Sequence, residues 1–222
     1  MRGTLACTFL CLALVWTACG LHRDTPLMAA AVRGDLQEID RLLAAGTPVD
    51  KQDGHGFTAL IAAARAGQLD SLRLLARRGA NLNLRGGGND WTPVMHALHK
   101  FRRRSAVTLI ELGADVNART RSGMTALMMA AGYGDAGSVR ALLDHGADPY
   151  AENPDGSSAL ALAVSGTPDI DKFTVGDCQT DTVKALLERA PDLKLKDNFH
   201  AKVARVAATV GHCSEVLGLI NR

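Results

Sequence analysis

The sequence predicts an all-α protein, a solenoid of about six helix-turn-helix units joined by short hairpin-like loops. One pattern, with a period of 33 or 34 residues, recurs along most of the chain, and each copy holds two short aliphatic segments punctuated by glycine. The composition agrees: 47% of residues are hydrophobic but only 4% are aromatic, so small and aliphatic side chains fill the core. One helix pair cannot bury its apolar side alone, whereas stacked pairs can, which explains the repetition.

Each copy opens with a hydroxyl residue that is expected to cap the first helix by accepting a hydrogen bond from a backbone N–H. The five openers are Thr25, Thr58, Thr92, Thr125 and Ser158. Alanine stands five residues after every opener, and glycine stands nine residues after most of them, where it suits a left-handed turn. Phe101 replaces that glycine in the third copy. Because bulky residues disfavour positive φ, the sequence predicts a distorted turn there, or one lengthened by a helical continuation.

The openers begin a motif that resembles the T-P-L-H-x-A signature of the ankyrin repeat family. The motif stands as "TPLMAAA", "TALIAAA", "TPVMHAL" and "TALMMAA" at residues 25–31, 58–64, 92–98 and 125–131. This resemblance covers about residue 24 to the C-terminus, and it implies a solenoid that binds another protein and performs no catalysis. The histidine of the family pattern is absent, and the resemblance therefore implies that its hydrogen bond between repeats is lost. It is replaced by Met28, Ile61, Met95 and Met128.

The repeat domain is expected to span 21–222. Its repeats lie near 24–53, 54–87, 88–120, 121–153 and 154–196, and a degenerate copy at 197–222 forms the terminal cap. The fifth repeat is longer than the others, since its second aliphatic segment arrives 44 residues after its counterpart instead of 33. An insertion at 165–175, where glycine and proline break the periodicity, accounts for the difference.

Residues 1–19 have the pattern of a signal peptide: Arg2 precedes 14 uncharged, mostly apolar residues, too few for a comfortable membrane span. The residues before Cys19 resemble a bacterial lipoprotein cleavage box, which predicts lipidation of Cys19 and a place in the bacterial cell envelope, facing the periplasm. Plain cleavage after Gly20, which would leave a soluble periplasmic protein, is the alternative. A retained anchor or a chain that is not exported is a further one.

Two pairs of residues invite a chemical interpretation. Cys178 and Cys213 each precede a second helix, so adjacent repeats would bring them together as a disulfide in an oxidising compartment. Two unrelated free thiols are the alternative. His96 and His99 lie three residues apart on one helix side, but a closed metal site needs about four ligands, so packing or solvent-exposed histidines are expected and no metal. The basic cluster at 102–104 is expected to form a solvated turn or to contact an acidic partner.

The leader-free chain contains no G-x-S-x-G, P-loop or H-E-x-x-H motif, so we expect no enzyme and no cofactor. A formal charge of +2 gives no electrostatic steer toward nucleic acid, and the membrane is expected to matter only through an N-terminal lipid. One alternative is an enzyme or ligand-handling protein that uses the loop at 165–176, with Asp169, Asp171 and the adjacent Asp177 as candidate residues. The other is a cytosolic regulator whose leader is misread.

The main hypothesis is a monomeric module that binds a protein partner on its concave surface. The family resemblance implies that partners contact the hairpin tips and the exposed sides of the first helices. These positions lie just before each opener and seven to eight residues after it. Their occupants include several of the chain's few aromatic residues, which are favoured at binding hot spots when exposed. The predicted contact residues are His55, Phe57, Arg65, Trp91, His99, Lys100, Arg121, Met124 and Tyr133.

Overall fold

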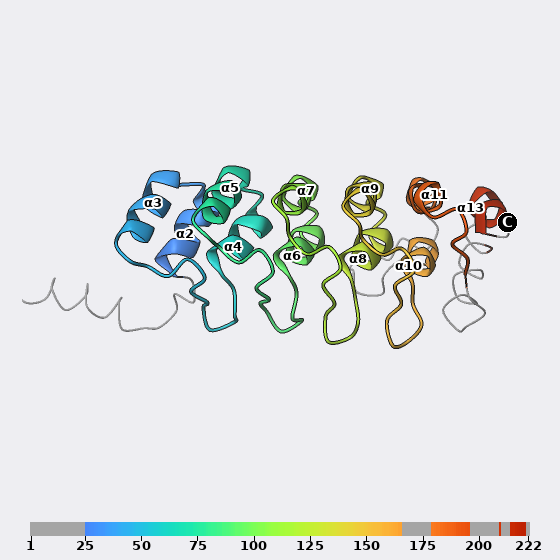
Figure 1. Cartoon of the computed structure of the whole chain (residues 1–222), viewed down its shortest axis with the longest axis horizontal. Helices are drawn as coiled ribbons and strands as arrows, with labels where there is room; N and C mark the ends of the chain where they lie inside the picture. The colour runs from blue at the N-terminus through green and yellow to red at the C-terminus, as the bar shows by residue number, and fades with distance from the viewer. Residues whose placement is uncertain (1–24, 166–178, 196–208, 210–213, 221–222) are drawn as a thin grey trace, which may run out of the picture.

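The computed structural model describes residues 25–165, 179–195, 209 and 214–220, and within these ranges every regular element is a helix. Figure 1 shows a single row of helix pairs, so the predicted all-α solenoid is confirmed. The helices of the described part are α2 (Pro26–Arg33), α3 (Leu36–Ala44), α4 (Ala59–Ala66), α5 (Leu69–Arg77), α6 (Pro93–His99), α7 (Arg103–Glu111), α8 (Ala126–Gly132), α9 (Ala136–Asp144), α10 (Ala159–Ser165), α11 (Thr180–Arg189) and α13 (Ser214–Ile220).

The helices form two layers. The first helices α2, α4, α6, α8 and α10 pack one against the next, and the second helices from α3 to α13 form the parallel upper row in Figure 1. Each first helix also packs against the second helix of its own repeat. The apolar sides of both layers therefore face each other, and the core is a continuous slab along the row.

The openers cap the first helices as the sequence predicts. Thr58 has extended backbone angles, and its hydroxyl oxygen accepts a hydrogen bond from the backbone N–H of Ile61 at 3.2 Å. The same bond is formed by Thr25, Thr92, Thr125 and Ser158. Each cap satisfies one backbone donor that a helix would otherwise leave unpaired.

Alanine occupies the tightest contacts of the first layer. The five alanines that stand five residues after the openers are all fully buried, at 0% exposure. In the second layer Leu75, Leu109 and Leu142 are equally buried. Close packing between neighbouring helices explains why a small residue recurs at one position and leucine at the other.

The loops between repeats project from one side of the row (Figure 1) and return on themselves as hairpins. Isolated antiparallel bridges close three of them, at Gly86–Trp91, Arg119–Thr125 and Glu152–Ser158. The hairpin before Thr92 lies against the hairpin before Thr58: a Cβ atom on Gly86 would lie 2.3 Å from the carbonyl oxygen of Gly56. Only glycine permits this approach, so the glycine-rich segment "RGGGND" serves close packing of neighbouring hairpins.

Polar contacts link the repeats through the bases of the hairpins. Asn83 accepts a hydrogen bond from the backbone N–H of Asp115 at 2.8 Å, and Asn117 accepts one from Asp148 at 2.9 Å. Asp50 makes the corresponding contact to Asn81. This series of side chains provides inter-repeat hydrogen bonds in a chain that lacks the family's histidine at the usual position.

The predicted distortion at Phe101 is wrong. Phe101 adopts φ 55°, in the left-handed region, and α6 ends two residues before it. The backbone N–H of Arg102 donates to Ala97 at 2.8 Å, as that of Asp35 donates to Ala30 at 3.1 Å. The ordinary turn therefore persists, because its hydrogen bonds and the exposed position of the phenyl ring, 64% accessible, hold a conformation that costs about 1–2 kcal/mol for a non-glycine residue.

The register of the stack resumes after the insertion. Gln179 donates from its side chain to the carbonyl of Gly132 at 3.2 Å, and Gln68 makes the equivalent bond to Val32 at 3.0 Å. The segment 166–178 lies outside the described residues, as does most of the first half of the predicted cap. The leader with Cys19, the pair Cys178 and Cys213, and Asp169, Asp171 and Asp177 also lie outside them, so those predictions stay predictions.

None of the helices in the described ranges combines the length and the apolar character needed to span a membrane.

Candidate functional site

A line of rings crosses the second, third and fourth repeats where the hairpins meet the first helices. Successive ring centroids are 5.2, 5.5, 4.8, 6.4 and 5.5 Å apart, in tilted or edge-to-face pairs. We call it the ring ladder; its members, in order, are Phe57, His96, Trp91, His99, Tyr133 and Phe101. Such pairs add to the area that they bury, so the ladder forms a stiff inner surface.

His96 is the buried centre of the ladder, at 2% exposure. Its Nε2 lies 3.0 Å from the carbonyl oxygen of Gly86 and must donate to it, which leaves a lone pair on Nδ1 to accept from Arg65 Nη1 at 3.2 Å. Burial lowers the pKa of His96 to about 4, and the nearby guanidinium of Arg65 acts in the same direction, against the opposing bond to Gly86. His96 is therefore neutral at pH 7, and Arg65 is held 5.0 Å above the ring of Phe57.

The second histidine, His99, packs within the ladder. His99 Nδ1 and the hydroxyl of Tyr133 are hydrogen-bonded at 3.1 Å, and the indole of Trp91 contacts the rings of both His96 and His99. Among the described residues no three His, Cys, Asp or Glu side chains gather closely enough to hold a metal ion. Their role within this part of the chain is to fix the ladder.

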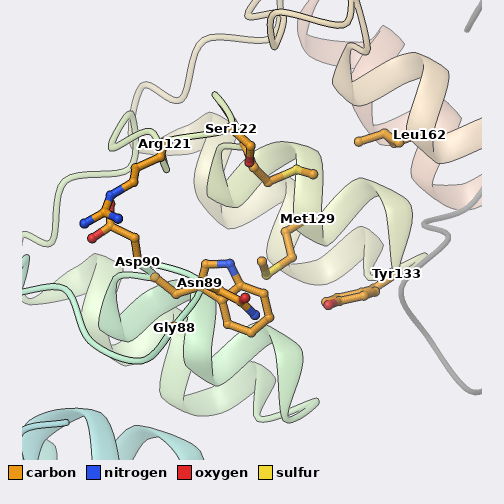
Figure 2. A pocket seen from close by; sticks show the side chains of 10 residues that line it. Gly88, Asn89, Asp90, Arg121, Ser122, Met129, Tyr133 and Leu162 are labelled. Carbon is orange, nitrogen blue, oxygen red and sulfur yellow. The ribbon is translucent and has the colours of Figure 1, made fainter. Parts of the chain in front are cut away.

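A cavity of about 440 Å³ lies beside the ladder, between the hairpin before Thr92 and the fourth repeat (Figure 2). One end is apolar and the other is polar: Figure 2 shows Asp90 and Arg121 facing each other at one side, with Tyr133 and Leu162 at the far side. The lining residues are Gly88, Asn89, Asp90, Trp91, Arg121, Ser122, Met124, Met129, Tyr133 and Leu162. The cavity suits a side chain with an apolar body and a polar neighbour.

Asp90 is an unusual residue for its position, which has left-handed backbone angles. It stands two residues before its opener with φ 58°, where the second, fourth and fifth repeats have Gly56, Gly123 and Gly156. Its Oδ2 accepts from Arg85 Nη1 at 3.0 Å and lies 3.8 Å from Arg121 Nε. The side chain of Arg121 is 88% exposed, so its guanidinium remains open to another acceptor.

A second hollow of about 390 Å³ begins on the other side of Tyr133. It is lined by Phe101, Arg103, Arg104, Tyr133, Gly134 and Asp135. Arg103 Nε lies 2.6 Å from Asp135 Oδ1, and Arg102, which precedes it, donates to the carbonyl of Arg65 at 3.3 Å. Two members of the predicted basic cluster thus link neighbouring repeats, and Arg104 is exposed beside the hollow.

The structure brings together several of the predicted contact residues and separates others. Trp91, Arg121, Met124 and Tyr133 line the cavity, whereas Phe57, Arg65 and His99 belong to the ladder or to its edge. His55 and Lys100 are exposed but outside the cavity lining. Trp91, one of the predicted contact residues, is only 9% exposed, because its ring packs against both His96 and His99.

Sequence reasoning missed part of the lining. Met129 and Leu162 stand four residues after their openers, on the same helix side as Tyr133, which follows Met129 by four. The sequence could have indicated both residues, because His96 also stands four residues after its opener. Asp90 was signalled too, as a residue in place of a recurring glycine.

The repeats are also the part of the chain that is similar to known proteins. The sequence model for ankyrin repeats in three copies matches residues 5–86 and 27–120, and the model for many copies matches 109–163. A putative ankyrin repeat-containing protein of Treponema pallidum is 34% identical over 136 residues, which cover 61% of this chain and 46% of that protein. The mitochondrial disaggregase of Bos taurus is 33% identical over 65% of this chain.

Human ankyrin repeat and SOCS box protein 6 is 32% identical over 62% of this chain. The chain spans less than half the length of these relatives: 46%, 22% and 35% respectively. The similarity therefore concerns a stack of repeats that occurs in proteins of different overall organisation.

Proposed function

The chain belongs to the ankyrin repeat family, and from this premise we propose that it is a non-catalytic module that binds another protein. The proposed binding surface is the hairpin-side face, formed by the hairpin tips and the exposed sides of the first helices around the third and fourth repeats. Ankyrin repeats mediate binding to other proteins in general; the partner and this particular face are our proposal.

The cavity beside the ring ladder is the observation that carries the proposal. It offers aromatic and methionine side chains next to an exposed arginine, which are the residue types favoured at protein interfaces. The ladder holds this surface in place before binding, since its rings pack against one another and His96 is anchored on both nitrogens. A preformed site loses less conformational freedom on binding.

Site-specific photo-crosslinking tests the proposal. A photoreactive amino acid replaces Ser122, an exposed residue that lines the cavity, in the full chain expressed in its own cells. We expect one major crosslinked protein, identified by mass spectrometry and then confirmed with purified components. The matched control places the same amino acid at Glu111, an exposed residue at the end of α7 in the other layer, where the crosslink should be absent. Equal crosslinking at both sites would contradict the proposed face.

We further propose that the module is exported and tethered to the bacterial envelope through Cys19, with its repeats facing the periplasm. The pattern of a basic residue, a short apolar stretch and a small-residue box before Cys19 supports this. Labelling with radioactive palmitate should mark the full chain, and Cys19→Ala should abolish the label. Labelling that persists in Cys19→Ala would contradict the proposed tether. A protein found entirely in the cytosolic fraction would contradict the proposed export.

A further inference from the structure

Two hollows share Tyr133 as a lining residue: the cavity of Figure 2 and the hollow beside Phe101. We treat them as one groove between the third and fourth repeats. It extends from the hairpin tips, where Asp90 and Arg121 lie, to the start of α7, where Arg103 and Arg104 lie. A single extended segment of a partner chain has room to contact both ends.

The middle of this groove is apolar. Trp91, Met124, Met129 and Leu162 surround the part of the cavity next to Tyr133. Flexible methionine side chains adapt to the shape of an aliphatic group. The middle therefore fits one aliphatic side chain of moderate size, such as leucine.

Both ends of the groove are cationic. At the tip end, two guanidiniums, of Arg85 and Arg121, share the single carboxylate of Asp90, and Arg121 is the more distant and the more exposed. At the other end, Arg103 is paired with Asp135, while Arg104 forms no ion pair with the described residues. Four guanidiniums thus lie beside two carboxylates, so the groove complements a segment that carries negative charge.

The indole of the cavity argues against a nucleic acid as the occupant. Base stacking needs a free aromatic face, but Trp91 is 9% exposed and packs against His96 and His99. An aliphatic floor with arginines at its ends suits a peptide whose hydrophobic residue is flanked by acidic ones.

We infer that the groove between the third and fourth repeats binds an extended acidic segment of the partner protein, with one aliphatic side chain in the cavity and carboxylates on Arg121 at one end and Arg104 at the other. This inference rests on the proposed protein-binding function and specifies the chemistry of its partner.

Methionine-methyl NMR of the full chain tests the inference, because Met124 and Met129 line the cavity and Met28 is buried in the first repeat. The probe is an acetylated and amidated nonapeptide whose central leucine is flanked on each side by two glutamates. We expect saturable shifts of the Met124 and Met129 methyl signals and no shift of Met28. A twin with lysines in place of the glutamates should not saturate, and a twin with glycine in place of leucine should bind about tenfold more weakly or worse.

Two variants test the ends of the groove. Arg121→Gln and Arg104→Gln should each weaken binding of the acidic peptide by about two- to fivefold, as for partly exposed ion pairs. Arg73→Gln is the matched control: Arg73 is an exposed arginine on α5, in the other layer, and its loss should leave the affinity unchanged. Equal effects of all three substitutions would mean that only the net charge matters, which would overturn the assigned contacts.

Several outcomes would overturn the acidic-segment inference while leaving the proposed function standing. These are tighter binding of the lysine twin, stronger shifts with single-stranded oligothymidylate, or no shift of either cavity methyl with any probe. The proposed function has its own test in the crosslink at Ser122. A specific crosslinked protein together with silent peptides would show that the face binds a partner of different chemistry.

Discussion

The second and third repeats share one core and differ in the surface that they present. Thr58 and Thr92 cap their first helices with the same bond, and Leu75 and Leu109 are both fully buried. The third repeat, however, has a hairpin one residue longer, since its opener follows the previous one by 34 residues. It also replaces two left-handed glycines of the second repeat, Gly56 and Gly67, with side chains.

Those replacements show where this chain departs from the repeat pattern. Asp90 and Phe101 are the non-glycine residues with positive φ in the described ranges, and both belong to the third repeat. Each costs of the order of 1 kcal/mol, a cost that persists where neighbouring structure holds the conformation and that clusters at functional sites. Both residues border the groove, which indicates that the third repeat differs from the second on its surface while it keeps the capping threonine and the buried leucine.

The largest expected effect tests whether the second and third repeats contribute equally to the core. Leu109→Ala and Leu75→Ala should each lower the free energy of unfolding by about 2–5 kcal/mol, since both side chains are fully buried. Chemical denaturation followed by circular dichroism measures both. If one substitution cost less than about 0.5 kcal/mol, the two repeats would not share a core and the comparison would break.

The next test concerns His96, which stands where the second repeat has Ala62. Because burial lowers the pKa of His96 from 6.5 to about 4, the unfolded chain binds a proton more readily than the folded one between these pH values. Stability from this group is complete above about pH 6.5, falls as the pH drops toward 4 and is lost below, by about 3 kcal/mol in all.

Denaturation curves at several pH values between 4 and 7 should therefore show a steep loss in the unmodified chain. His96→Gln retains a donor for Gly86 but does not titrate, so its curve should be flatter over that window. Matching slopes for the two proteins would mean that His96 is not held neutral by the fold.

A smaller effect is expected at the left-handed turns, where the third repeat has Phe101 and the second has Gly67. Phe101→Gly should raise the free energy of unfolding by about 0.5–1 kcal/mol, because glycine adopts φ 55° without strain and the ring it removes is mostly exposed. The converse substitution in the second repeat, Gly67→Ala, should lower it by about 1 kcal/mol. Thermal unfolding of both variants measures the difference, and a destabilised Phe101→Gly would show that the phenyl ring is structural.

The smallest expected effect concerns the link from the third repeat to the fourth. Arg103 is about half exposed and pairs with Asp135, so Arg103→Gln should cost less than about 1 kcal/mol. Added salt should reduce this cost further. One link from the second repeat to the first runs through the neutral side chain of Gln68, so the effect of Gln68→Ala should not change with salt. If the cost of Gln68→Ala in unfolding free energy also changed with salt, the contrast between the charged and the neutral link would not hold.

The sequence by itself determined the repeat, the helix boundaries and most of the core. Openers, alanines and left-handed glycines are read from local rules, since a helix cap or a turn depends on residues only a few positions apart. It also placed Trp91, Arg121 and Tyr133 on one face, because equivalent positions of successive repeats lie on the same side of the stack.

Only the tertiary structure decided that Trp91 is covered, that Phe101 keeps the turn and that Asp90 lies between two arginines. Some of these outcomes depend on contacts between residues about 30 positions apart, such as Asp90 with Arg121, and others on how a hairpin packs against its own helix, such as Trp91 with His96. Local preference weighs against a left-handed phenylalanine by about 1–2 kcal/mol, and the hydrogen bonds of the turn, together with the ring contact to Tyr133 in the next repeat, override it.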